Sequence, residues 1–284
     1  MREKDFHLQD PTWCPGCGIY AIFSTLKKTA AVREMRPEDM VVVTGIGCHG
    51  RLNNYFKAYG FHALHGRALP LAQGIKLANK GLSVITVSGD GDAYSIGLGH
   101  FIHAIRRNID LTFIVVNNMI YGLTQGQTSP TSQKGFISVS TPFGSKESPI
   151  CGPRLALDSG GTFVARGFSG APNQLFKLIE KAIQHHGFSF VEVLSPCVTH
   201  NRTNTYDWFK KNTFDVDQEE DFDPSSREMA WKFLNVKDKL TLGLLYQEEK
   251  PTYEDQTLPA KVPLIRSDMR IEAKKLDKIL ERFE

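Results

Sequence analysis

A strand–helix–strand pattern between residues 82 and 118 constrains the fold of this chain more than any other feature. Residues 82–88 and 111–116 are short apolar runs, rich in β-branched side chains, of the kind that form buried strands. Residues 93–108 carry apolar side chains at helical spacing, and such a crossover joins two parallel strands in a right-handed sense. The same patterns predict strands at 40–44, 162–165 and 189–194 and helices at 19–31, 67–79 and 172–186. This alternation predicts an α/β fold with a doubly wound, mostly parallel sheet.

A polar residue follows each of the two strands. Asp90 lies in the segment 89–93, and Asn118 follows it by 28 residues in the segment 116–122. The carboxyl ends of parallel strands form the usual ligand crevice of an open α/β sheet. Carboxylate and amide oxygens suit Mg2+, which takes its remaining ligands from phosphates. Either half alone could be an ordinary turn, but the pair predicts a magnesium–diphosphate clamp.

Five cysteines, an odd number, argue against a disulfide framework. Cys14 and Cys17 form a C-x-x-C pair, whereas Cys48, Cys151 and Cys197 stand alone. A thioredoxin-like dithiol would follow the first strand of a βαβ unit, but a polar N-terminal segment precedes this pair. The pair could also be an accident of packing, but the pattern favours a metal site over a redox dithiol.

Composition excludes several classes of partner. The chain has 284 residues, a formal net charge of +3, 41% hydrophobic and 23% charged residues, which is ordinary for a soluble globular protein. Its Lys and Arg residues are scattered, so we expect no nucleic-acid partner. It shows no signal peptide at its start and no apolar run near the roughly 20 residues that span a bilayer. We expect a cytoplasmic protein without a membrane partner.

The sequence divides near residue 201. Residues 1–201 are predicted to form the α/β domain. Residues 202–284 include an acidic stretch at 215–223 and look too poor in apolar runs to form a core of their own. We expect a C-terminal arm packed on this or a partner subunit, ending in an amphipathic helix over residues 267–284.

A second glycine motif is misleading. Gly45-x-Gly47-x-x-Gly50 follows a predicted strand, as in dinucleotide-binding folds. However, no Asp or Glu occurs between Gly50 and Asp90, so the acidic residue expected about 20 positions later is missing. We therefore do not predict binding of NAD.

Several motifs together resemble one family. The clamp is similar to the thiamine diphosphate signature, Gly-Asp-Gly followed further along the chain by Asn-Asn. The other motifs are Trp13-Cys14-Pro15-Gly16-Cys17-Gly18, Gly45-Ile46-Gly47-Cys48, His65-Gly66-Arg67-Ala68 and Ser195-Pro196-Cys197. Over about residues 10–201 the chain resembles the β subunit of the 2-oxoacid:ferredoxin oxidoreductases. The stretch 196–201 is most similar to members that use 2-oxoglutarate.

The resemblance implies three bound groups. A 4Fe–4S cluster would be held by Cys14, Cys17, Cys48 and Cys197, whereas Cys151 matches no motif. Mg2+ would be held by Asp90, Asn118 and the main-chain carbonyl of Ile120. The implied thiamine diphosphate contacts are Ile46, Gly47, Cys48, His49, His65, Gly66, Arg67, Ala68, Gly91, Asp92, Gly122 and Leu123. His49 and His65 are candidates for a catalytic role, with a structural hydrogen bond as the rival interpretation, and Gln125 is a candidate for contact with substrate.

The resemblance also implies a reaction. It is the reversible, coenzyme A-dependent oxidative decarboxylation of a 2-oxoacid, with 2-oxoglutarate giving succinyl-CoA and CO2. Electrons pass from the thiamine-bound intermediate through the cluster to ferredoxin. The alternatives are pyruvate as substrate, a non-redox thiamine-dependent decarboxylase or carboligase with zinc at the cysteines, and an inactive scaffold.

The residue that activates thiamine diphosphate is missing from the expected region. Enzymes of this kind need a glutamate against the aminopyrimidine, yet no Glu occurs between Glu38 and Glu147. In the family that glutamate belongs to an α subunit with a pyrimidine-binding domain. We therefore expect an αβ unit or an (αβ)2 assembly, inactive without the partner.

Overall fold

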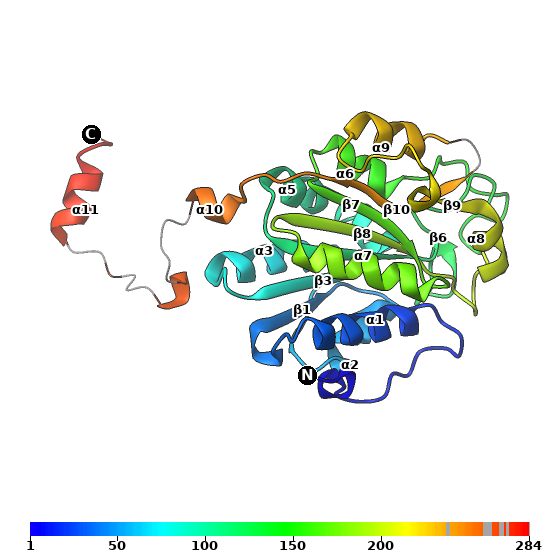
Figure 1. Cartoon of the computed structure of the whole chain (residues 1–284), viewed down its shortest axis with the longest axis horizontal. Helices are drawn as coiled ribbons and strands as arrows, with labels where there is room; N and C mark the ends of the chain where they lie inside the picture. Colours follow the sequence, from blue (N-terminus) through cyan, green and yellow to red (C-terminus); the bar gives the residue numbers. More distant parts are fainter. Residues whose placement is uncertain (237–238, 258–262, 267–269, 271–272, 284) are drawn as a thin grey trace.

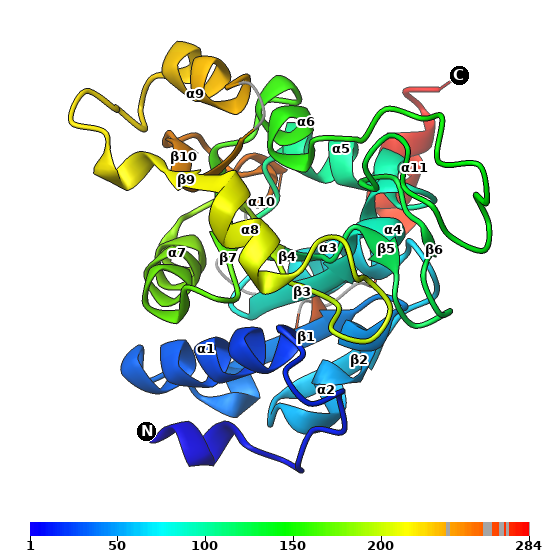
Figure 2. The same ribbon diagram turned by 90° about the vertical axis from the view of Figure 1, so that its right-hand side faces the viewer.

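An eight-stranded sheet runs through the molecule, with helices on both of its faces (Figures 1 and 2). The computed structural model describes residues 1–236, 239–257, 263–266, 270 and 273–283. In chain order the strands of this sheet are β1 (Met40–Thr44), β2 (Tyr59–His62), β3 (Ser83–Gly89), β4 (Leu111–Asn117), β7 (Phe163–Phe168), β8 (Phe188–Leu194), β9 (Thr213–Asp215) and β10 (Leu240–Gln247). A separate hairpin contains β5 (Ile120–Tyr121) and β6 (Gln127–Thr128).

The strand order is β2-β1-β3-β4-β8-β7-β10-β9. The first six strands in this order are parallel, whereas β10 is antiparallel to β7 and parallel to β9. Every residue of β1, β4, β7 and β8 is buried, as expected for parallel strands covered on both faces. The predicted doubly wound, mostly parallel sheet is confirmed.

Two layers of helices enclose the sheet (Figure 2). The helices are α1 (Ile19–Val32), α2 (Leu52–Tyr55), α3 (Ala68–Ala78), α4 (Asp90–Tyr94), α5 (Leu98–Arg107), α6 (Gly152–Asp158), α7 (Pro172–Gln184), α8 (Tyr206–Asn212), α9 (Arg227–Leu234), α10 (Tyr253–Thr257) and α11 (Ala273–Leu280). Apolar residues of α1 and α7, such as Leu26 and Leu178, form one core cluster against the sheet. On the other face α3, α5, α6 and α9 form a second cluster, in which the Phe101 and Phe190 ring centroids lie 4.9 Å apart. The sheet is therefore buried from both sides.

The single helix predicted over residues 93–108 is wrong, because the chain forms two helices, α4 and α5, with a break at residues 95–97. At the break, the loop that contains Gly66 comes close to Gly97. A Cβ atom on Gly66, whose φ is +67°, would lie 2.6 Å from the Gly97 amide nitrogen. The break gives this loop room between the end of α4 and the start of α5.

The predicted arm, residues 202–284, divides into two parts. Up to α10 it packs on this chain, and β10 extends the sheet, so residue 201 does not mark the end of the sheet. The apolar run of β10 was overlooked because polar segments surround it. Figure 1 shows α11 standing apart from the sheet. Within the predicted terminal helix, residues 267–269, 271–272 and 284 lie outside the described residues.

No helix in the described ranges is both long enough and apolar enough to cross a membrane.

Candidate cofactor and cluster site

Four adjacent parallel strands bring the candidate residues together. β1, β3, β4 and β8 are neighbours in the sheet, so their carboxyl ends share one edge. The residues that follow these ends are Gly45, Asp90, Asn118 and Ser195. The prediction that Asp90 and Asn118 follow neighbouring parallel strands is confirmed.

Asp90 is a buried carboxylate whose partners are hydroxyl groups. The residue is only 2% exposed, and Ser129 Oγ and Thr131 Oγ1 each donate to its Oδ2 at 2.5 Å. Burial raises the pKa of Asp90 to about 6. Within the described part of the chain no Lys, Arg or His forms an ion pair with it. A buried carboxylate in this state fits a divalent cation, since burying an unpaired charge is costly.

Asn118 is the second predicted metal ligand of the clamp. The strand ends that carry Asp90 and Asn118 are called the two jaws of the clamp below. Its Oδ1 accepts a hydrogen bond from the amide of Ile120 at 3.0 Å, and an amide oxygen keeps a second lone pair for a metal. The main-chain carbonyl of Asn118 accepts from Nδ2 of the buried Asn201, also at 3.0 Å. Both the side chain and the backbone of this jaw are therefore fixed.

A cavity of about 80 Å3 opens at the clamp. The predicted ligands and contacts that line it are Ile46, Gly47, Cys48, His49, His65, Asp90, Gly91, Asp92, Asn118, Ile120, Gly122 and Leu123. Three predicted contacts do not line it. Gly66 donates its amide to Asp92, Arg67 is exposed, and Ala68 is buried in the core at the start of α3. Tyr121, which was not predicted, also lines the cavity, and its hydroxyl lies 3.3 Å from the carbonyl of Gly91.

Asp92 joins two of the predicted cofactor segments. Its Oδ1 accepts from the amides of Gly66 at 2.7 Å and Ile46 at 3.2 Å, and lies 3.3 Å from His65 Nδ1. A Cβ atom at Gly45 would overlap the same carboxylate. The side chain thus fixes the loops after β1 and before α3, a structural role that a pattern of Gly-Asp-Gly-Asp does not reveal.

The two candidate histidines differ in their surroundings. His49 is 3% exposed, and burial lowers its pKa to about 4, so its ring is neutral at pH 7. Its Nε2 has no hydrogen-bond partner in the described structure, although the residue lines the cavity. His65 is partly exposed, and its Nδ1 lies 3.3 Å from Asp92 Oδ1 without a hydrogen bond to any described residue. Gln125 is exposed, with φ +80°, and does not line either cavity of this site.

Four cysteines line a neighbouring cavity of about 430 Å3. They come from the segments before α1, after β1 and after β8, and are Cys14, Cys17, Cys48 and Cys197. Trp13 Nε1 donates to the carbonyl of Cys48 at 2.7 Å and so joins two of the segments. Burial raises the pKa of Cys17 to about 11, and the other three thiols add to this effect. A thiolate at this place therefore needs positive charge nearby, which fits a bound metal centre.

Cys151 lies elsewhere, against the core cluster on the opposite face of the sheet. Its Sγ accepts from Arg166 Nη2 at 3.4 Å, and it does not line the cavity of the other four cysteines.

The two cavities share walls. Cys48, Asn118 and Gly122 line both of them. A Cβ atom on Gly122 would lie 3.1 Å from Asn118 Nδ2, 3.6 Å from Cys197 Sγ and 4.0 Å from Cys48 Sγ. Because Gly122 has no side chain, nothing from this residue separates the clamp from the thiols.

A buried ion pair supports the clamp from behind. Arg166 Nε donates to Glu192 Oε2 at 2.6 Å, and both side chains are almost fully buried. Glu192 Oε1 accepts from the Tyr94 hydroxyl at 2.8 Å and from Asn117 Nδ2 at 3.2 Å. The charges are therefore satisfied inside the core, next to β4, the strand that Asn118 follows.

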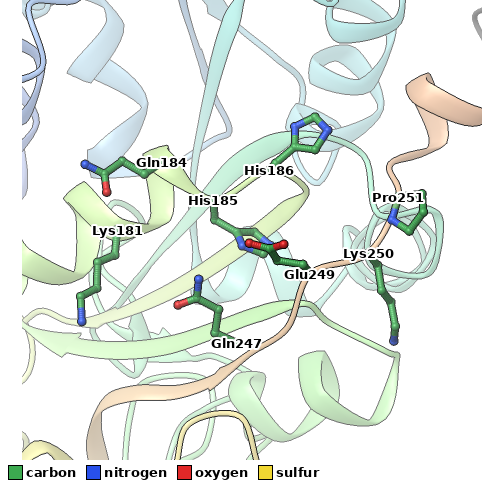
Figure 3. A pocket seen from close by; sticks show the side chains of 8 residues that line it. All are labelled: Lys181, Gln184, His185, His186, Gln247, Glu249, Lys250 and Pro251. Carbon is green, nitrogen blue, oxygen red and sulfur yellow. The ribbon is translucent and has the colours of Figure 1, made fainter.

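Another cavity, of about 740 Å3, lies at the opposite edge of the sheet (Figure 3). It is lined by Lys181, Gln184, His185, His186, Gln247, Glu249, Lys250 and Pro251. These residues lie where α7 and β10 end and before β8 begins, so they are far along the strands from the clamp. None of them belongs to a motif singled out by the sequence.

Comparison with known proteins agrees with this geometry. Residues 45–193 match the model of the thiamine pyrophosphate enzyme C-terminal TPP-binding domain, and residues 197–261 match that of the C-terminal part of the pyruvate ferredoxin oxidoreductase β chain. The chain is 41% identical to a 2-oxoacid:ferredoxin oxidoreductase subunit β of Saccharolobus solfataricus, over 88% of this chain and 86% of the relative. It is 46% identical to the 2-oxoglutarate oxidoreductase subunit KorB of Mycobacterium tuberculosis, over 71% of this chain and 54% of the relative.

A solved structure is also similar over almost the whole chain. It is a 2-oxoglutarate:ferredoxin oxidoreductase from Magnetococcus marinus with 2-oxoglutarate, coenzyme A and succinyl-CoA bound. The TM-score is 0.91 at 34% identity, covering 98% of this chain and 96% of the other. The match to a thiamine pyrophosphate enzyme domain, followed by the match to a ferredoxin oxidoreductase β chain and the identity to relatives over most of the chain, shows that the chain belongs to the β subunits of the 2-oxoacid:ferredoxin oxidoreductases.

Proposed function

We propose that this chain binds thiamine diphosphate, Mg2+ and a 4Fe–4S cluster for an enzyme that oxidises a 2-oxoacid with coenzyme A. The balanced reaction turns 2-oxoglutarate, coenzyme A and two oxidised ferredoxins into succinyl-CoA, CO2, a proton and two reduced ferredoxins. The observation that carries the proposal is the shared wall of the two cavities, which includes Cys48, Asn118 and Gly122. A cluster held by the cysteines would therefore lie beside thiamine diphosphate held by the clamp.

The clamp residues would hold Mg2+ and, through it, the diphosphate. Asp90 supplies the charged oxygen, Asn118 its amide oxygen and Ile120 its carbonyl, which are the hard donors that Mg2+ prefers. Bound thiamine diphosphate supplies a carbon nucleophile and an electron sink for decarboxylation. The neutral ring of His49, with its free Nε2 in the described structure, lies in the same cavity and is available to the reacting groups.

The cysteines would hold the cluster through four thiolates, as such clusters require. Four thiolates suit zinc as well as an iron–sulfur cluster, so the cysteines alone do not choose between them. Membership in a ferredoxin oxidoreductase family favours the redox function over a zinc-containing carboligase.

A partner protein would complete the active site. Neither cavity is lined by a glutamate within the described residues, so the activating carboxylate must come from outside them. Large apolar side chains are exposed around the clamp, among them Leu64 at 77% and Leu123 at 57%. We therefore propose that this face is covered by an α subunit and that the assembly is αβ or (αβ)2, in the cytoplasm.

The substrate is proposed to be 2-oxoglutarate, because several similar proteins carry that name and the similar solved structure holds this acid. An assay of the αβ complex with 2-oxoglutarate against pyruvate, each with coenzyme A and ferredoxin, tests this choice. A clear preference for pyruvate would contradict it.

The cofactors are tested by purifying the αβ complex without oxygen and measuring iron, acid-labile sulfide and zinc. We expect about four irons and four sulfides per β chain, with no turnover by the isolated β chain. Stoichiometric zinc without sulfide would contradict the redox function and would favour a carboligase instead.

A further inference from the structure

The segment 129–133, here called the bracket, connects the two jaws of the clamp. It follows the hairpin β5–β6 and is largely buried: Thr131 and Ser132 are each 3% exposed. The bracket is folded on itself, because the amide of Ser129 donates to Ser132 Oγ at 2.9 Å and the amide of Ser132 donates to the carbonyl of Ser129 at 3.1 Å. It does not line either cavity, so it does not touch the cofactor space directly.

On one side the bracket holds Asp90. The hydroxyls of Ser129 and Thr131 both lie 2.5 Å from Oδ2, and no other hydroxyl contacts this carboxylate in the described structure. Thr131 Oγ1 also lies 2.9 Å from Oδ1 of Asn117. Because a hydroxyl has a single proton to donate, Thr131 donates either to Asp90 or to Asn117 at any one time. Oδ2 is thus held by two hydroxyl groups, and Asp90 also lines the cavity of the clamp.

On the other side the bracket holds the jaw that contains Asn118. Ser132 Oγ donates to the carbonyl of Met119 at 2.6 Å. Gln133 Oε1 accepts from Asn204 Nδ2 at 3.0 Å, and Asn204 in turn bonds to Asn201, the residue that holds the Asn118 carbonyl. The bracket therefore contacts both jaws through buried hydrogen bonds, although it lies far from Asp90 in the sequence.

We propose that Thr131 is a positioning residue that, with Ser129, aims the Asp90 carboxylate at Mg2+ and sets the geometry of the clamp before the metal binds. This inference rests on the proposed function, since it concerns the same metal site. Outer partners that orient a ligating carboxylate commonly change metal affinity by about 10–100-fold when removed. Their effect is to pre-organise the ligand, so the loss should appear in Mg2+ affinity and be overcome by excess Mg2+.

The test compares Thr131→Val, which keeps the shape and removes the hydroxyl, with Thr131→Ser, which keeps the hydroxyl. Mg2+ is titrated by calorimetry into the metal-free αβ complex saturated with thiamine diphosphate. We expect Thr131→Val to weaken Mg2+ binding roughly 10–100-fold, Thr131→Ser to stay near wild type, and iron content to be unchanged in both. Turnover of Thr131→Val should return at high Mg2+ concentration.

If Thr131→Val does not assemble, Ser129→Ala removes the second donor and is measured in the same way. Wild-type Mg2+ affinity in the variants that assemble would overturn the role of the bracket while leaving the proposed function intact. A wild-type complex that binds no Mg2+ with thiamine diphosphate would instead overturn the proposed function, and the inference with it.

Discussion

The clamp and the cysteine cavity adjoin, yet they differ in how far the protein alone fixes their geometry. Asp90 is buried and held by two hydroxyls, and Asn118 is held through its side chain and its carbonyl. Of the four cysteines that line the second cavity none is fully buried, and Cys14 is exposed. Burial raises the pKa of Cys17, so its thiolate is unfavourable until a metal centre supplies positive charge. The geometry of the clamp is therefore fixed before a metal binds, whereas the four cysteines, here called the cysteine half of the site, need a bound metal centre to stabilise their thiolates.

The largest effect is expected at the cysteine half. Cys17→Ser should abolish ferredoxin reduction and lower iron and sulfide to background, because the cluster requires four thiolates. Binding of thiamine diphosphate should remain near wild type, since Cys17 lines only the cysteine cavity. Iron analysis and a cofactor-binding titration of the αβ complex measure both. Cys151→Ser is the control and should keep the cluster; if it lost iron, the assignment of four ligands would be wrong.

The second prediction concerns a change in the clamp, which should spare the cluster. Asp90→Asn keeps the shape of the side chain and removes its charge, so Mg2+-dependent binding of thiamine diphosphate should weaken by more than the roughly 100-fold seen for outer partners. The cluster should be retained, which calorimetry and iron analysis together would show. Asp10→Asn, at an exposed carboxylate, should change neither quantity. Loss of iron in Asp90→Asn would mean that the two halves are not independent.

The buried ion pair of Arg166 and Glu192 is expected to stabilise the fold. Arg166→Met leaves Glu192 buried without its cation, which should lower the free energy of unfolding by about 3–5 kcal/mol. The double change Arg166→Met with Glu192→Met should recover much of this loss, since replacing both charges by apolar groups is often neutral. Denaturation of the αβ complex measures the difference. Arg36→Met, at an exposed pair with Asp39, is the control and should show no resolvable change.

The smallest effect is expected at Gly122, which lines both the cavity of the clamp and the cavity of the cysteines. Gly122→Ala would place a methyl group 3.1 Å from Asn118 Nδ2 and close to two cluster thiols. Overpacking of this size costs about 1–3 kcal/mol, so binding of thiamine diphosphate should weaken roughly tenfold. Gly99→Ala is the control, because a Cβ atom there meets nothing within 4 Å. Equal affinity of the Gly122→Ala and Gly99→Ala variants for thiamine diphosphate would show that the shared wall tolerates a methyl group at residue 122.

Much of the fold followed from local patterns. The strand predicted at 40–44 coincides with β1, and the helix predicted at 172–186 differs from α7 by two residues at its end. These elements are set by apolar periodicity and by a Pro at the start of the helix, which are local properties. The break between α4 and α5 was missed because a neighbouring loop decides it, and the strand β10 was missed because polar segments surround its apolar run.

The sequence by itself determined the two jaws and the four cysteines, because each stands at a position that a local motif marks. Parallel strands then bring Asp90 and Asn118 to one edge without further information. Only the tertiary structure decided that Asp92 joins two loops and that Ser129 and Thr131 hold Asp90. These contacts join residues about 26–46 positions apart in the chain, through side-chain hydrogen bonds whose partners depend on the path of the loops rather than on any local periodicity.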